Sequence, residues 1–277
     1  MKFFEYGEEN EKTLMIECGY LAKWNPGLLP FIKMAQKKYH VIIQAYDGFN
    51  DDEPDTVFHS VKEEAEMGAD FIVNNLAGKL DILYGISMGG MVGNEILLDD
   101  RVKVHTFIAD GYTIMPMPSF RFKAFENLYV SMYSSLIYSV LTRHQGLLAI
   151  ALGRTKESIS ESLYTDVSRV SIGNSVRSEI GYRYKYESFN KTDSYVFHGS
   201  AEKGAARKVH KLLNKGIRFT HKMYKNTGHA ELIHKNPAIL ISLIDKAFSH
   251  RLRLKKDEGV SKTYERRTKT PINARKC

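Results

Sequence analysis

The segment from Leu80 to Leu98 places a serine where it could act as a nucleophile. A strand-like run is followed by Gly85-Ile86-Ser87-Met88-Gly89-Gly90, and a helix-like run begins directly after it. This G-x-S-x-G pattern between a strand and a helix is typical of a tight turn that presents a serine hydroxyl. Glycine at the two flanking positions removes Cβ atoms that would collide across such a turn. Ser87 would then stand at the amino end of a helix, where N–H groups stabilise developing negative charge.

A histidine near the end of the sequence is the candidate base. His229 lies in Thr227-Gly228-His229-Ala230, after a strand pattern and before a helix that begins at Asn236-Pro237. A loop at the carboxyl end of one strand can carry an imidazole to a serine on a neighbouring strand, whatever their separation in sequence. His234 follows five residues later, which does not fit the H-E-x-x-H spacing of a zinc site. We therefore expect no metal and no organic cofactor.

The elements that must position these residues alternate between short apolar runs and helical patterns. This alternation predicts an α/β fold, with a mostly parallel central sheet of about seven strands and helices on both faces. The expected strands are Lys2–Tyr6 at an edge, Thr13–Glu17, His40–Ala45, Leu80–Gly85, Val104–Ala109, Ser194–His198 and Ile217–Tyr224. The expected helices are Gly27–Lys38, Val57–Ala77, Met88–Asp99, Glu202–Lys215 and Asn236–His250.

Residues 111–186 interrupt this alternation with helical, aromatic-rich patterns. We interpret them as a helical cap inserted into a core formed by residues 1–110 and 187–250. The aromatic and methionine side chains suggest an apolar pocket beneath this cap. The pocket candidates are Tyr20, Leu21, Tyr112, Met115, Phe125, Tyr129 and Tyr133.

The charge of the chain is concentrated at one end. The formal net charge is +8, but residues 251–277 hold ten basic and three acidic residues, so the first 250 residues are close to neutral. We expect 251–277 to form a solvated tail, and we expect no nucleic-acid partner for the body.

The two cysteines, Cys18 and Cys277, exclude a disulfide framework. No run approaches the roughly 20 apolar residues of a membrane span, so a cytoplasmic protein is predicted.

The two chemical motifs together resemble the α/β-hydrolase superfamily, over about residues 13–250 with 111–186 as the cap. The resemblance implies the chain order serine, acid, histidine. It places the acid after the strand that precedes the histidine strand, where this sequence reads His198-Gly199-Ser200-Ala201-Glu202. Glu202 is therefore the implied acid, although the family usually has aspartate there. Asp110, at the end of the strand after the nucleophile helix, is the alternative.

The same resemblance implies two backbone N–H groups that stabilise an oxyanion. One belongs to Met88, the residue after the nucleophile. The other lies in Cys18-Gly19-Tyr20-Leu21, where the family often has His-Gly, and we assign it to Tyr20, with Leu21 as the alternative. Cys18 itself is expected to be a small buried residue.

These residues predict a serine hydrolase that cleaves an acyl bond, an ester in the first instance, of a small apolar substrate. An acyltransferase, a thioesterase or an aminopeptidase could use the same groups. A non-catalytic ligand-binding protein on this fold is a further alternative, although binding alone does not require both Ser87 and His229. A role of the tail in docking to nucleic acid or to acidic membranes, and a homodimer, remain open alternatives.

Overall fold

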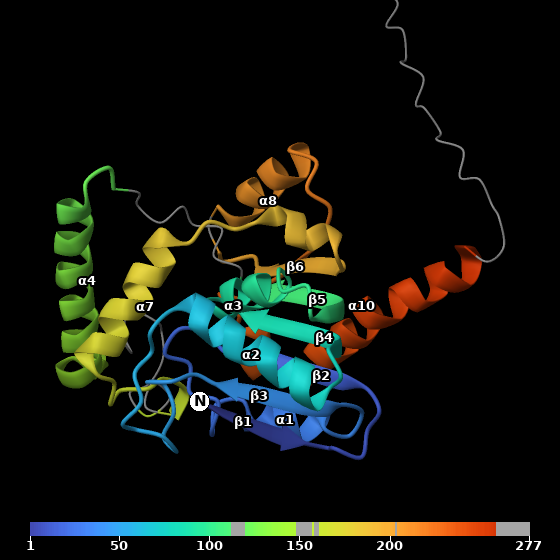
Figure 1. Ribbon diagram of the computed structural model, residues 1–277, viewed down its shortest axis with the longest axis horizontal. Coiled ribbons are helices and arrows are strands. Elements are labelled where there is room, and N and C mark those ends of the chain that lie inside the picture. Colours follow the sequence, from blue (N-terminus) through green and yellow to red (C-terminus); the bar gives the residue numbers. More distant parts are fainter. Residues whose placement is uncertain (112–119, 148–156, 158–160, 203, 259–277) are drawn as a thin grey trace, which may run out of the picture.

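The centre of the molecule is a seven-stranded sheet. In the computed structural model, which describes residues 1–111, 120–147, 157, 161–202 and 204–258, its strands are β1 (Lys2–Tyr6), β2 (Thr13–Glu17), β3 (His40–Ala45), β4 (Lys79–Ile86), β5 (Lys103–Asp110), β6 (Asp193–Gly199) and β7 (Thr220–Tyr224). Their order in the sheet is β1-β3-β2-β4-β5-β6-β7 (Figure 1). β1 pairs antiparallel with β3, and the other strands are parallel. The predicted fold class and edge strand are confirmed.

The central strands are buried on both faces, which explains why they read as continuous apolar runs. In β4, Ile82, Leu83 and Tyr84 are all fully buried. The register of β4 against β5 pairs Ile86 with Asp110. The turn after β4 and the end of β5 therefore lie at the same edge of the sheet.

Helices surround the sheet. They are α1 (Leu29–Ala35), α2 (Val61–Asn75), α3 (Gly89–Ile96), α4 (Lys123–Arg143), α7 (Arg169–Gly181), α8 (Ala205–Asn214), α9 (Leu232–Lys235), α10 (Pro237–Glu258) and the 3₁₀ helix η1 (Tyr186–Asn190). α2 packs against α3, and α1 packs against α9 and α10. Asn236 caps α10 through its Oδ1, which accepts the N–H of Ile239 at 3.3 Å. Among the helices described, none combines the length and apolar composition that a bilayer crossing requires.

Most element boundaries differ from the sequence prediction by a few residues, and two of the differences have a clear structural expression. The strand expected from Ile217 begins at Thr220, because the N–H of Ile217 still bonds to the carbonyl of Leu212 in the turn that ends α8. α10 does not end at residue 250 but continues to Glu258. The first eight residues of the predicted tail are thus helical, and 259–277 lie outside the described residues.

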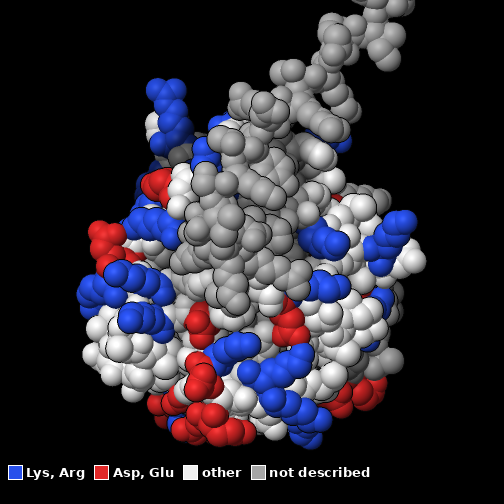
Figure 2. Space-filling view, turned by 90° about the vertical axis from the view of Figure 1, so that its right-hand side faces the viewer, with Lys and Arg blue, Asp and Glu red and all other residues white. Residues whose placement is uncertain are grey.

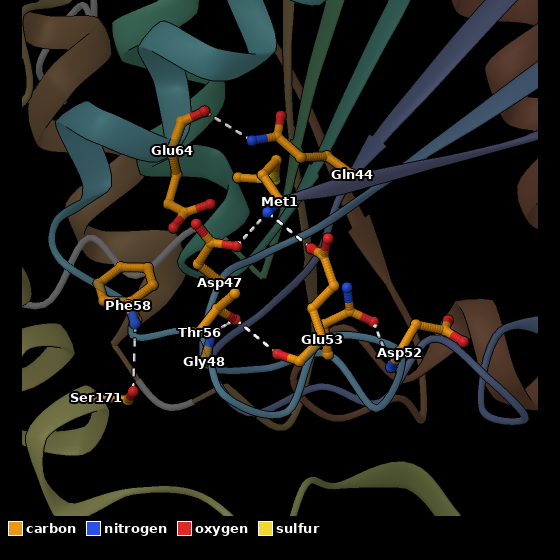
Figure 3. A network of polar contacts seen from close by, with 11 residues as sticks. Met1, Gln44, Asp47, Gly48, Asp52, Glu53, Thr56, Phe58, Glu64 and Ser171 are labelled. Carbon is orange, nitrogen blue, oxygen red and sulfur yellow. Dashed lines mark hydrogen bonds and ion pairs between the residues drawn. The ribbon is translucent and has the colours of Figure 1, made fainter.

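Two helices of the predicted cap, α4 and α7, pack against each other beyond one end of the sheet (Figure 1). α7 is attached to the loop between β3 and α2, because Ser171 Oγ accepts the N–H of Phe58 at 3.2 Å (Figure 3). Asp47 and Glu53 of the same loop form ion pairs with the α-amino group of Met1. This loop therefore connects the start of the chain to α7.

Charged side chains of both signs are interspersed on the face shown in Figure 2. Surface ion pairs such as Arg101 with Asp70 and Lys191 with Asp100 join opposite charges. This arrangement agrees with the nearly neutral charge of the first 250 residues.

Candidate active site

Ser87 occupies the turn between β4 and α3. Its φ of 53° is in the left-handed region that non-glycine residues rarely adopt. The N–H of Ser87 donates to the carbonyl oxygen of Asp110 at 2.9 Å, which holds the turn against the end of β5. A Cβ at Gly85 would come within 2.5 Å of the carbonyl oxygen of Gly89, and one at Gly89 within 2.1 Å of that of Glu17. The glycines are therefore required by the close approach that the sequence motif predicted.

His229 and Glu202 form a direct contact at the same edge of the sheet. Nδ1 of His229 lies 2.8 Å from Oε2 of Glu202. The two residues follow β7 and β6, which are neighbouring parallel strands. The N–H of Gly199 donates to the other oxygen, Oε1, of Glu202 at 2.7 Å and fixes the carboxylate. A carboxylate that accepts the Nδ1 proton leaves Nε2 of the imidazole free to act as a base.

Ser87 and His229 both lie against the segment Asp110-Gly111. The carbonyl of Asp110 accepts the Ser87 N–H, and a Cβ placed on Gly111 would lie 2.9 Å from Cε1 of His229. Residues 142 positions apart in sequence are thus gathered around one turn of backbone. Gly111 has a φ of +60° and leaves the space that the imidazole ring occupies.

The charges around His229 favour its protonated form. Burial lowers the pKa of His229, but the hydrogen bond and charge of Glu202, together with the charges of Asp110 and Glu179, outweigh it and raise the pKa above its usual 6.5. Burial raises the pKa of Glu202, and the bonds from His229 and from the Gly199 N–H outweigh it and lower the pKa below 4.5. The raised pKa of His229 and the lowered pKa of Glu202 show that each residue stabilises the charged form of the other.

Asp110, the alternative acid, has a different partner. Its buried carboxylate accepts a hydrogen bond from the Tyr84 hydroxyl at 2.5 Å. Burial, with a smaller contribution from the charge of Glu202, raises the pKa of Asp110 to about 6, against the effects of Tyr84 and His229. The geometry therefore favours Glu202 over Asp110 as the partner of the imidazole.

The two expected oxyanion donors belong to segments next to Ser87. Met88 is the N-cap residue of α3, and the loop that carries Tyr20 lies against the nucleophile, since a Cβ on Gly19 would be 3.4 Å from Cβ of Ser87. In the described part of the chain, neither the Met88 nor the Tyr20 N–H donates to a protein acceptor. Both amides can therefore serve an incoming oxygen.

Comparisons with known proteins identify this architecture. No family model and no curated protein matches the sequence. The structure is similar to that of an α/β hydrolase family protein from Desulfitobacterium hafniense, with 20% identity, a TM-score of 0.69, and 88% of this chain and 99% of that chain covered. It is also similar to MenH from S. aureus, with 14% identity, a TM-score of 0.67, and 91% and 98% covered. The chain has the α/β-hydrolase fold. A thermophilic esterase from Thermogutta terrifontis shares the α/β-hydrolase fold at 14% identity and a TM-score of 0.66, with 92% of this chain and 93% of that chain covered.

The residues predicted to line the substrate pocket differ in their burial and in their position on the α/β-hydrolase fold. Tyr129 and Tyr133 stack with ring centroids 5.6 Å apart on α4. Phe125, on the same helix, is 60% exposed, and Leu21 is buried in the core. Phe125 therefore points to solvent, because the helix turns it away from its packed face. Tyr112 and Met115 lie outside the described residues.

Neither a reactive thiol nor a metal site is found among the described residues. Cys18 is buried, and burial raises the pKa of its thiol far above the usual range, as expected of an inert cysteine. Among the described residues, no three His, Cys, Asp or Glu side chains are grouped so that they could hold a metal ion.

One acidic residue near the site was missed by the sequence analysis. Glu179, on α7, interacts electrostatically with His229. A usable signal existed: Ser171, Ser175 and Glu179 follow one another at intervals of four, which places them on one face of a helix. Ser171 and Ser175 are buried, so this polar face points into the molecule.

Proposed function

We propose that the protein is a serine hydrolase that cleaves a carboxylic ester through Ser87, His229 and Glu202. The observation that carries the proposal is the 2.8 Å contact between His229 and Glu202, with the imidazole and Ser87 both next to Asp110-Gly111. A positioned nucleophile, a base and an acid that orients the base are the three parts of this reaction.

In the first half of the reaction, Nε2 of His229 takes the proton of Ser87 as Oγ attacks the substrate carbonyl. The carbonyl oxygen becomes an anion that the Met88 and Tyr20 N–H groups stabilise. One such donor contributes about 10²- to 10³-fold to the rate. His229 then gives the proton to the departing alcohol, and the acyl group remains on Ser87.

In the second half, His229 takes a proton from water, and the resulting hydroxide attacks the acyl-enzyme. The carboxylic acid leaves and Ser87 regains its proton. Glu202 keeps the imidazole in the required tautomer throughout and stabilises its charged form. In this proposal α4 and α7 cover the site, and their aromatic side chains surround an apolar acyl group.

The experiment that tests this function is labelling with a fluorophosphonate, followed by peptide mapping. Ser87 should be modified in the wild type and no label should appear in Ser87→Ala, whereas the exposed-serine control Ser242→Ala should be labelled normally. Wild-type protein that hydrolyses no p-nitrophenyl ester and takes up no label would contradict the proposal and favour a non-catalytic binding protein.

A second measurement separates hydrolysis from transfer. Turnover of ester, thioester and amide substrates, each with and without an added alcohol or amine, reports the bond cleaved and the acceptor used. The proposal expects esters to be cleaved fastest and water to be the main acceptor. Faster turnover in the presence of an acceptor, with the acyl group recovered on it, would identify an acyltransferase.

A further inference from the structure

α7 crosses the edge of the sheet that carries the candidate active site. Near its start, Ser171 Oγ accepts the Phe58 N–H at 3.2 Å. Just beyond its end, the Tyr182 hydroxyl donates to Oδ1 of Asn94 on α3 at 2.8 Å. Between these two attachments, Ser175 lies beside the Tyr20 hydroxyl. One face of α7 therefore contacts the loops after β3 and β2, and the residue that follows α7 contacts the nucleophile helix.

Glu179 projects from this face. It lies four residues after Ser175 and eight after Ser171, and residues at these spacings share one side of a helix. Its carboxylate interacts electrostatically with His229 and with the Tyr20 hydroxyl. His229 is the proposed base, and the N–H of Tyr20 is a proposed oxyanion donor, so Glu179 lies near the proposed catalytic residues.

The Glu179 carboxylate has no partner among the described residues: no ion pair and no side-chain hydrogen bond involves it. The neighbouring acids are different, since Glu202 is bonded to His229 and Glu126 pairs with Lys123. Burial raises the pKa of Glu179 to about 7, and the charge of His229 opposes this shift only in part. The Glu179 side chain is half-buried, so a ligand can reach its carboxylate, and a charge that is partly removed from water gains from a partner of opposite charge.

The side chains around Glu179 suit a cation. Tyr20 and Tyr133 both interact electrostatically with Glu179, and Tyr129 stacks on Tyr133. Aromatic faces attract ammonium groups, and more strongly where water is excluded. A carboxylate beside several tyrosine rings is thus complementary to a positively charged, partly apolar group.

We propose that Glu179 and the tyrosines beside it form a subsite for an ammonium group of the substrate, so that the protein prefers esters that carry a positive charge near the reacting carbonyl. This inference rests on the proposed function, because it assigns the substrate class of the same site. The apolar acyl group and the cationic group then occupy different parts of the space beneath α4 and α7.

The test uses two fluorophosphonates that differ only at the end of a short arm, which is trimethylammonium in one and tert-butyl in the other. With either probe, the Oγ–P bond to Ser87 forms, the P–F bond breaks, fluoride leaves and the serine proton passes to His229. The ratio of the two inactivation rate constants therefore cancels every effect on the nucleophile that both probes share. The wild type should react with the cationic probe about tenfold faster.

Glu179→Gln should bring this ratio close to one, while its reaction with the neutral probe changes much less. The control Glu187→Gln removes one carboxylate from η1, before β6 and so at the opposite edge of the sheet, where Glu187 is exposed. It should keep the wild-type ratio. Circular dichroism and thermal unfolding of both variants establish that they are folded.

The outcomes are distinguishable. Equal rates for the two probes in the wild type, or a preference that survives Glu179→Gln, would overturn the inference and leave the proposed function intact. Failure of both probes to modify Ser87 would overturn the proposed function, and the proposed ammonium subsite would then also be rejected.

Discussion

Glu202 holds His229 through a 2.8 Å contact between Oε2 and Nδ1, and its second oxygen is fixed by the N–H of Gly199. The carboxylate is largely buried, with 13% of its side chain exposed, while the imidazole is 48% exposed. The Nδ1 atom of His229 is thus anchored by the protein, and about half of the side chain remains accessible.

Glu202→Gln should lower kcat by about 10²- to 10⁴-fold, because an amide cannot hold the imidazole in the reactive tautomer or stabilise its charge. Asp110→Asn should have a smaller effect on kcat, since Asp110 bonds to Tyr84. Steady-state kinetics of both variants on one p-nitrophenyl ester measures the difference. The reverse ranking would identify Asp110 as the acid.

The rate should increase with pH with a midpoint above 6.5, because the pKa of His229 is raised and the base must be unprotonated. Glu202→Gln removes the main group that raises this pKa, so the residual activity should titrate at lower pH. A pH profile of kcat/KM provides the test. A midpoint that does not move would show that Glu202 does not interact with the base.

The same pair links folding to pH. Because the folded pKa of His229 lies above its ordinary value, its contribution to stability is complete below about pH 6.5 and disappears as the pH rises through the folded pKa. The difference in unfolding midpoint between the wild type and His229→Gln should therefore shrink from pH 6 to pH 8. Thermal scans at three pH values measure it, and a constant difference would contradict this linkage.

Gly85→Ala should destabilise the fold by about 1–3 kcal/mol or more and abolish labelling of Ser87, because its Cβ would lie 2.5 Å from a backbone oxygen. Gly173→Ala is the matched control on α7, where a Cβ meets nothing within 4 Å. That change should stabilise the protein by about 0.4–1 kcal/mol. Urea unfolding of the two variants gives both values. An unperturbed Gly85→Ala would show that the turn tolerates a side chain.

The preference for the cationic fluorophosphonate should rise several-fold between pH 6 and pH 8, because the pKa of Glu179 is about 7 and only its ionised form attracts an ammonium. His229, Tyr20 and Tyr133 also face this carboxylate. The ionisation of His229 affects both probes and cancels in their ratio, and the raised pKa values of the two tyrosines keep them neutral in this range. A flat ratio from pH 6 to pH 8 would argue against Glu179 as the cation-binding group.

The sequence by itself determined the strands, the glycine turn around Ser87 and the loop that carries His229. These features depend on neighbours a few residues away: apolar runs form buried strands, and two glycines permit one tight turn. The sequence also restricted the candidate acid to Glu202 or Asp110. It could not show which of the two carboxylates contacts His229, because both lie at the ends of strands that finish at the same edge of the sheet.

Tertiary structure decided which carboxylate meets the imidazole. Asp110 is held by Tyr84 on the neighbouring strand, whereas the turn after β6 directs Glu202 toward His229. It also brought Glu179 to the site from a helix with no catalytic motif, and turned Phe125 outward on α4. Side-chain pairings of this kind depend on how separate helices and strands pack against one another. That packing is determined by residues throughout the chain and not by any one segment.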